Sequence, residues 1–114
     1  MTYEPWDVVV VPFPFTDRTS SKRRPALVLS SLPFNSKSGH LVLAMITSAE
    51  NSGWPLDVTI QDVDVAGILS ASVVRMKLFT LDQQLIQKRV GSIGELDRRA
   101  VLHSMQGLFN LMRT

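Results

Sequence analysis

The chain has 114 residues, of which 45% are hydrophobic and 19% charged, with a formal net charge of +2 and no cysteine. Its length predicts one domain over residues 1–114, and its composition is typical of globular proteins rather than disordered or membrane ones. The lack of cysteine excludes disulfides, thiol chemistry and cysteine-type zinc sites. The first residues do not read as a signal peptide and no long apolar run follows, so we expect a cytoplasmic protein without membrane contact.

Basic and hydroxyl-bearing side chains gather in one short segment. It reads Arg18-Thr19-Ser20-Ser21-Lys22-Arg23-Arg24. A loop of this kind suits phosphate groups, although a short basic run is more often a solvated surface loop. The total charge is too small to identify a nucleic-acid-binding protein, so the clustering is the more informative observation.

The first half of the chain alternates β-rich runs with turn residues. Residues 6–11 predict a strand that the prolines at positions 12 and 14 end, and residues 16–23 are then expected as a basic loop. A second strand is predicted for residues 25–30 and a third for residues 41–47. Proline, asparagine, serine and glycine between them predict a turn over residues 32–39. No helix is expected in this half.

The second half adds three strands and one helix. Strands are predicted for residues 57–60, 73–81 and 86–93. From Glu95 the apolar period changes to that of a helix, with one stripe at Val101, Met105, Leu108 and Met112. Short strands followed by one helix predict a mainly β fold, a small antiparallel barrel with a C-terminal helix, because closure removes exposed strand edges. A sandwich is the alternative.

Several of these segments occur in an order typical of one family. They are Trp6–Phe13, Lys22–Ser30, Ile46-Thr47-Ser48, Trp54-Pro55, Ala66–Leu69, Ser72–Arg75 and Lys88–Gly91. Together they resemble MazF/PemK toxins of type II toxin-antitoxin systems from about Trp6 to Leu111. The resemblance implies an SH3-like barrel of the CcdB/Kid/MazF type, a homodimer, and a metal-independent, cofactor-free endoribonuclease that cleaves single-stranded RNA at short motifs. It also implies a cognate antitoxin, whose acidic tail covers the RNA groove, and contact with operator DNA only through the antitoxin complex.

The resemblance also supplies candidate site residues. Arg24 matches the family's catalytic arginine, and its guanidinium suits stabilisation of a charged phosphorane after the 2′-hydroxyl attacks the neighbouring phosphate. Thr47 is expected to face Arg24 and bind the scissile phosphate, and Arg75 is the third catalytic candidate. The residues expected to bind RNA are Arg18, Thr19, Lys22, Arg23 and Lys77.

One departure leaves the general acid and base open. The Kid-like branch has a catalytic aspartate two residues after the arginine that Arg75 matches, but this chain has Lys77. His40 and His103 are expected at the surface, because the first starts a strand far from Thr47 and the second lies on the polar face of the helix. Asp62 and Asp64 alone offer too few ligands for a cation. Trp54 is expected to pack its loop onto the barrel rather than stack on a base.

Two other functions remain possible from the sequence. A gyrase-poisoning toxin of the CcdB type would share the fold, but such toxins end in Trp-Gly-Ile, whereas this chain reads Leu111-Met112-Arg113-Thr114. A non-catalytic barrel that binds RNA or a partner is the second alternative, which Lys77 supports.

Overall fold

The strands form one antiparallel sheet, and helices lie at its ends. The computed structural model describes residues 2–13, 22–51 and 53–110. The strands are β1 (Asp7–Phe13), β2 (Lys22–Val28), β3 (His40–Ser48), β4 (Val58–Thr59), β5 (Ser72–Asp82) and β6 (Lys88–Ser92). The helices are α1 (Leu32–Ser38), α2 (Val63–Ala66), the 3-10 turn η1 (Gln83–Leu85) and α3 (Glu95–Phe109). The sheet order is β4-β5-β3-β2-β1-β6.

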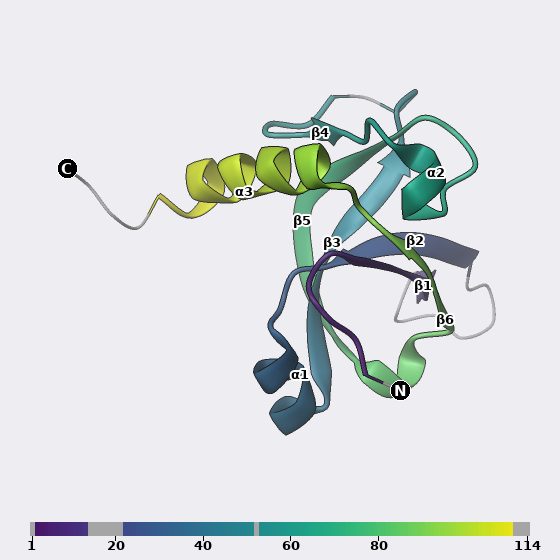
Figure 1. The fold of residues 1–114 in the computed structure, drawn as a ribbon, viewed down its shortest axis with the longest axis vertical. Coiled ribbons are helices and arrows are strands. Elements are labelled where there is room, and N and C mark those ends of the chain that lie inside the picture. The colour runs from purple at the N-terminus through teal and green to yellow at the C-terminus, as the bar shows by residue number, and fades with distance from the viewer. Residues whose placement is uncertain (1, 14–21, 52, 111–114) are drawn as a thin grey trace.

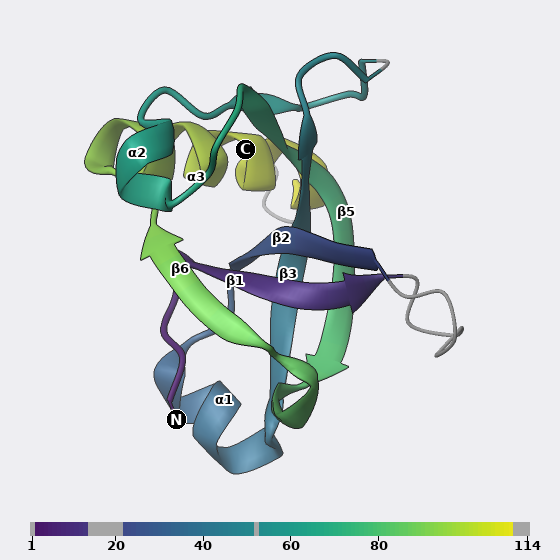
Figure 2. The same ribbon diagram turned by 90° about the vertical axis from the view of Figure 1, so that its right-hand side faces the viewer.

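The sheet is strongly curled, which confirms the predicted mainly β, barrel-like fold with a C-terminal helix. Figure 2 shows β6, β1 and β2 crossing β3 and β5 at a steep angle, so that the six strands wrap into a half-barrel. Helices α2 and α3 lie at one end of this half-barrel, and α1 lies at the other, beside the N-terminus (Figures 1 and 2). The two ends of the sheet are therefore covered by different helices.

Alternate residues along each strand feed two apolar clusters, one on each face of the sheet. The first cluster includes Val8, Leu27, Ile46 and Val74, with Val101 of α3 packed on it. The second includes Val9, Val11, Ala26, Val28, Leu41 and Leu43. The same alternation determines toward which face of the sheet the polar side chains at the start of β2 and at the end of β3 point.

Strand β1 continues past the point where proline was expected to end it. Pro12 pairs with Arg23 and Phe13 with Lys22, whereas pairing with β6 stops at Val10. Pro12 is tolerated because no strand lies beside it on one side, where its missing N–H would otherwise be needed. Because Pro12 and Phe13 of β1 pair with Arg23 and Lys22, β2 begins at Lys22 rather than at residue 25. Lys22 and Arg23 therefore belong to a strand and not to a loop.

The prediction of a turn over residues 32–39 is wrong, because helix α1 occupies it. Ser31 caps its start by accepting a hydrogen bond from the N–H of Phe34, and Pro33 lies in the first turn. Gly39 ends the helix in the left-handed conformation, with φ 71°. The residues read as turn-formers are thus the caps of a short helix. Helix α2, between Asp62 and Gly67, was missed for the same reason.

Helix α3 begins at Glu95 as predicted, but its buried stripe differs. Val101 is buried and Met105 half-buried, whereas Leu108 is exposed and Met112 lies outside the described residues. The stripe instead includes Asp97, which is buried and accepts hydrogen bonds from the backbone N–H groups of Gln61 and Asp62 at 2.9–3.2 Å. In the described residues no helix is both long and apolar enough to cross a membrane.

Candidate functional site

A pocket opens where β2 and β3 separate. The two strands are paired only from Ala26 and Met45 to Val28 and Leu43, so the first part of β2 extends beyond the paired register. The opening leads to a cavity of about 480 Å³. Its lining residues that carry polar side chains are Lys22, Arg23, Arg24, Thr47, Ser48, Ser70 and Ser72. None of the described lining residues is acidic, so the pocket suits an anion.

Arg24 lies on the rim of this pocket and has unused hydrogen-bonding capacity. Its guanidinium lies 5.5 Å from the centre of the Phe13 ring, the cross-strand neighbour of Lys22 on β1. Within the described ranges, its Nε is buried and has no hydrogen-bond partner. A buried guanidinium nitrogen without a partner is unfavourable, and an anion at the pocket mouth would satisfy it.

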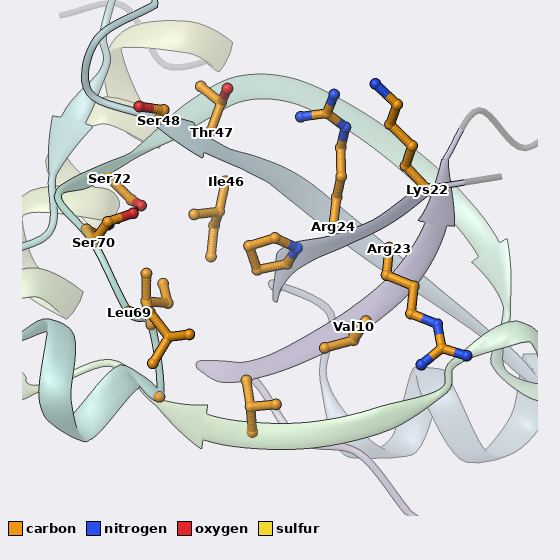
Figure 3. A pocket seen from close by; sticks show the side chains of 14 residues that line it. Val10, Lys22, Arg23, Arg24, Ile46, Thr47, Ser48, Leu69, Ser70 and Ser72 are labelled. Atoms are coloured by element: carbon orange, nitrogen blue, oxygen red, sulfur yellow. Dashed lines mark hydrogen bonds between the residues drawn. The ribbon is translucent and has the colours of Figure 1, made fainter.

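Thr47 lies on the same side of the sheet as Arg24. Continuing the register of β2 and β3 by two residues from the pair of Ala26 and Met45 brings Arg24 opposite Thr47. Figure 3 shows both side chains, with that of Lys22, directed to one side, and the side chain of Arg23 directed to the other. Arg24 and Thr47 therefore flank one opening.

The hydroxyl of Thr47 is held in one orientation by a neighbour. Thr47 is only 8% exposed. The Nδ2 of Asn51 donates a hydrogen bond of 2.5 Å to Thr47 Oγ1. Because the oxygen accepts this bond, the hydroxyl proton of Thr47 is available for donation to another acceptor. The side chain is thus prepared to donate to a phosphate oxygen.

Arg75 lies on the same face but is bound by a carboxylate. It pairs with Met45 on β3 while Thr47 pairs with Val73, so Arg75 is the diagonal neighbour of Thr47, about 7–8 Å away across the strands. Its Nε and Nη2 donate to the two carboxylate oxygens of Asp57 at 3.2 and 3.0 Å. These hydrogen bonds raise the pKa of Arg75 above its ordinary value. Arg75 does not line the pocket with Arg24 and Thr47.

Trp54 connects the two cations of β5. Its ring centre lies 5.8 Å from the Arg75 guanidinium and 4.6 Å from Lys77 Nζ. The backbone N–H of Trp54 also donates to Asp57. These contacts hold the Trp54 loop against β5, and the indole, which is 42% exposed, keeps an open surface beside two positive charges.

The other predicted site residues lie in different places. Lys22 and Arg23 line the pocket, but Arg18 and Thr19 lie outside the described residues. His40, at the start of β3, and His103, on α3, are exposed, as expected. Asp62 accepts a hydrogen bond from the N–H of Val65 and caps α2. Within the described ranges no three histidine, aspartate or glutamate side chains gather as a metal site.

Comparison with known families decides the membership of the chain. The family described as PemK-like, MazF-like toxin of type II toxin-antitoxin system matches residues 4–109. The chain belongs to this family. It is accordingly a MazF-like toxin of a type II toxin-antitoxin system, which confirms the resemblance seen in its sequence. A search of curated protein sequences gave no significant match.

Solved structures share the fold of this MazF-like toxin at low sequence identity. A MazE-MazF complex from Deinococcus radiodurans has a TM-score of 0.79 at 22% identity, covering 98% of this chain and 100% of the other. An endoribonuclease in complex with its cognate antitoxin from a mycobacterial species has a TM-score of 0.75 at 14% identity, covering 99% and 98%. The Mycobacterium tuberculosis toxin MazF-mt6 has a TM-score of 0.75 at 18% identity, covering 94% and 99%. These likenesses establish the fold.

Two residues that hold the candidate site residues of this MazF-like toxin were not predicted from the sequence. Asn51 orients Thr47, and Asp57 binds Arg75. Both lie between β3 and β4: Asn51 is in a stretch of polar turn residues, and Asp57 is at the start of the predicted strand 57–60, where the alternation gave it no functional role. Lys77 stands at the position of the Kid-like aspartate. Asp57, which comes from the segment before β4, nevertheless gives Arg75 a carboxylate partner.

Proposed function

We propose that this toxin is an endoribonuclease that cleaves single-stranded RNA at short sequence motifs and needs no metal ion. The observation that carries the proposal is that Arg24 and Thr47 both line one pocket, where the buried Arg24 Nε has no hydrogen-bond partner among the described residues. A phosphodiester at this mouth would accept hydrogen bonds from both side chains. Lys22 and Arg23 add positive charge to the same pocket, and no described lining residue opposes it.

The reaction needs no external nucleophile, because RNA carries its own. The 2′-oxygen forms a bond to phosphorus while the bond from phosphorus to the 5′-oxygen breaks, which leaves a 2′,3′-cyclic phosphate and a 5′-hydroxyl. The proton of the 2′-hydroxyl is lost and the 5′-oxygen gains one. Arg24 stabilises the extra negative charge of the phosphorane with a two-pronged donor, and Thr47 donates its hydroxyl proton to a phosphate oxygen.

Arg75 contributes positive charge from the next cross-strand row. Its guanidinium is fixed by Asp57, and it lies diagonal to Thr47 outside the pocket. Lys77 and the exposed part of Trp54 extend the same positive surface along β5. We assign this surface to the phosphates of RNA beside the cleavage point.

The proposed partners follow from the same pocket and from the related structures. The D. radiodurans MazE-MazF structures and the mycobacterial complex contain an antitoxin. A cognate antitoxin with an acidic segment would neutralise the cations of the pocket mouth, and operator DNA would be bound only through that complex. A homodimer is proposed as well, because Phe34 of α1 and Leu102 and Phe109 of α3 are exposed apolar residues.

The test uses purified protein and a panel of single-stranded RNAs in the presence of EDTA. We expect cleavage that leaves 2′,3′-cyclic phosphate ends, with kcat lowered about 10²- to 10³-fold in Arg24→Ala. Thr47→Val, which keeps the shape of the side chain, should lower kcat in the same direction. Arg99→Ala is the matched control, since Arg99 is an exposed arginine of α3 that pairs with Glu95. Intact RNA throughout the panel, or RNA bound tightly without cleavage, would contradict the proposal.

A further inference from the structure

The turn of residues 54–57 carries the groups that hold Arg75. Two hydrogen bonds close it, because the N–H of Asp57 donates to the carbonyl of Trp54 at 3.2 Å and the N–H of Trp54 donates to the carboxylate of Asp57 at 3.1 Å. From this turn Asp57 binds the Arg75 guanidinium, and the Trp54 ring lies 5.8 Å from the same group. The place of the Arg75 guanidinium therefore depends on the place of the turn.

The backbone of this turn is strained at Leu56. Its φ is 68°, in the left-handed region that is unfavourable for a residue with a Cβ. Glycine or asparagine is the usual residue at such a position in a turn. Strain of this kind persists only where the surrounding structure holds the residue in place. The contacts of the Leu56 side chain should therefore show what holds the turn.

The side chain of Leu56 lies on Gly107 of α3. A Cβ at Gly107 would lie 3.3 Å from Leu56 Cδ2 and 3.7 Å from Leu56 Cδ1, so both methyl groups rest over the glycine. Glycine inside a helix is itself unfavourable compared with most other residues. Two locally unfavourable residues thus meet in one contact, which gives a reason for both. The glycine leaves room for the leucine, and the leucine fixes the turn to the helix.

Helix α3 holds the other end of β4 as well. Asp97, in the first turn of α3, is buried and accepts hydrogen bonds from the N–H groups of Gln61 and Asp62, which follow β4. Leu56 precedes β4 and meets α3 near its last turn. Strand β4, which has only two residues, therefore runs beside α3 with a contact before it and another after it (Figure 1). The helix rather than this short strand sets the place of the turn.

We propose that Leu56 is a positioning residue for Arg75. Its contact with Gly107 holds the strained turn in one place, and the turn presents the carboxylate of Asp57 to the guanidinium. Helix α3 thereby determines where the positive charge of Arg75 lies beside the pocket. The effect on cleavage rests on the proposed ribonuclease function, whereas the placement of the turn by α3 does not.

The first measurement is kcat/KM on one RNA for variants on each side of the contact. Leu56→Gly relieves the strain but removes the side chain, and Gly107→Leu favours the helix but fills the space that Leu56 occupies. Each should lower kcat/KM at least about 10-fold, toward the roughly 100-fold loss that a misplacement of about 1 Å causes. Neither should cause a further loss in Arg75→Ala.

Two further variants separate the contact from strain and from side-chain loss in general. Leu56→Met, whose apolar side chain still reaches α3, should retain activity. Asn110→Gly is the matched control, because Asn110 also has a positive φ, 39°, and lies outside the turn. It should behave as the unchanged toxin. Full activity in both Leu56→Gly and Gly107→Leu would overturn the inference, and so would losses that add to that of Arg75→Ala.

The second measurement needs no RNA. The chain has two tryptophans, so in Trp6→Phe protein the emission of Trp54 alone reports the cations beside its ring. Leu56→Gly and Gly107→Leu should each shift this emission, and unshifted emission in both would overturn the inference. The kcat/KM series does not contain Trp6→Phe, so it decides alone if that change unfolds the protein. If the unchanged toxin cleaves no RNA, the proposed function fails, and the emission still decides whether α3 holds the turn.

Discussion

The amide of Asn51 donates a hydrogen bond to the hydroxyl oxygen of Thr47, and this contact sets which way the threonine proton points. The donor and acceptor roles matter, because Thr47 can give its proton to a phosphate only while another group donates to its oxygen. Asn51 is itself exposed, so the contact is not needed to fill the core. Its most direct effect is on the orientation of Thr47.

Replacing Asn51 by aspartate should therefore impair cleavage more than replacing it by alanine. A carboxylate would accept the Thr47 proton and place negative charge beside the substrate phosphate, whereas alanine only frees the hydroxyl to rotate. We expect kcat/KM to fall at least about 10-fold in Asn51→Asp, the effect of one misdirected charged hydrogen bond, and less in Asn51→Ala. Initial rates on one RNA measure both. Equal activity in the two variants would mean that the contact has no role in cleavage.

The ion pair between Asp57 and Arg75 predicts a non-additive pair of variants. If Asp57 acts by holding the Arg75 guanidinium, Asp57→Ala should lower kcat/KM by itself but cause no further loss in Arg75→Ala. Asp57 raises the pKa of Arg75, but a guanidinium stays charged near neutral pH even without this effect, so the loss in Asp57→Ala should not vary across neutral pH. Arg75→Lys should not restore activity, since an ammonium cannot bind both carboxylate oxygens in a fork. Additive losses would show that Asp57 acts separately.

Gly67 and Gly39 separate the effect of backbone strain from the effect of close contact. Both have positive φ, 74° and 71°, but a Cβ at Gly39 meets nothing within 4 Å. Gly39→Ala should thus lower the free energy of unfolding by about 1–2 kcal/mol through strain alone. A Cβ at Gly67 would lie 2.2 Å from the carbonyl oxygen of Val90, so Gly67→Ala should lower that free energy by about 1–3 kcal/mol more. Urea denaturation compares the two variants. Equal losses would mean that the contact between α2 and β6 relaxes freely.

Tyr3 gives the protein a pH dependence that can be observed directly, because it is the only tyrosine. Burial, followed by the nearby charge of Asp7, raises the pKa of Tyr3 above its ordinary value of 10.0. The folded state therefore holds the phenolic proton more tightly than the unfolded state. Stability is fully present below the unfolded pKa and is lost as pH rises through the higher folded pKa. Ultraviolet titration should give a midpoint above that of the urea-unfolded chain. Identical midpoints would contradict the burial.

The sequence allowed the strands and the last helix to be predicted, because their apolar periods are set by burial on one face. The short helices α1 and α2 could not be predicted, since their residues are typical of turns and become caps only once tertiary contacts favour a helical turn. The prediction that Pro12 ends the first strand was wrong for a related reason. Whether a proline interrupts a strand depends on whether a neighbouring strand needs its N–H, and β6 no longer pairs with β1 at Pro12.

The site shows the same division. Arg24, Thr47 and Arg75 were predicted as site residues through resemblance to a family, whereas Asn51 and Asp57, the partners of Thr47 and Arg75, were not predicted. Partners of this kind depend on the register of β3, β4 and β5 and on the path of the segment between them. No local pattern in the sequence encodes that Asp57, just before β4, will lie opposite Arg75 on the neighbouring strand β5. The orientation of the site is therefore information that only the folded chain contains.

We expect that Arg24 lowers the free energy of unfolding of the free toxin. Its Nε is buried without a partner among the described residues, which is unfavourable by about 1–3 kcal/mol in the absence of a ligand. Arg24→Met keeps the length of the side chain and removes the unpaired donor, so it should raise the free energy of unfolding by about 1 kcal/mol while cleavage is lost. Urea denaturation and RNA cleavage are measured on the same preparation. A destabilised Arg24→Met would mean that the guanidinium is satisfied in the free toxin, and the anion site would then lack its main physical support.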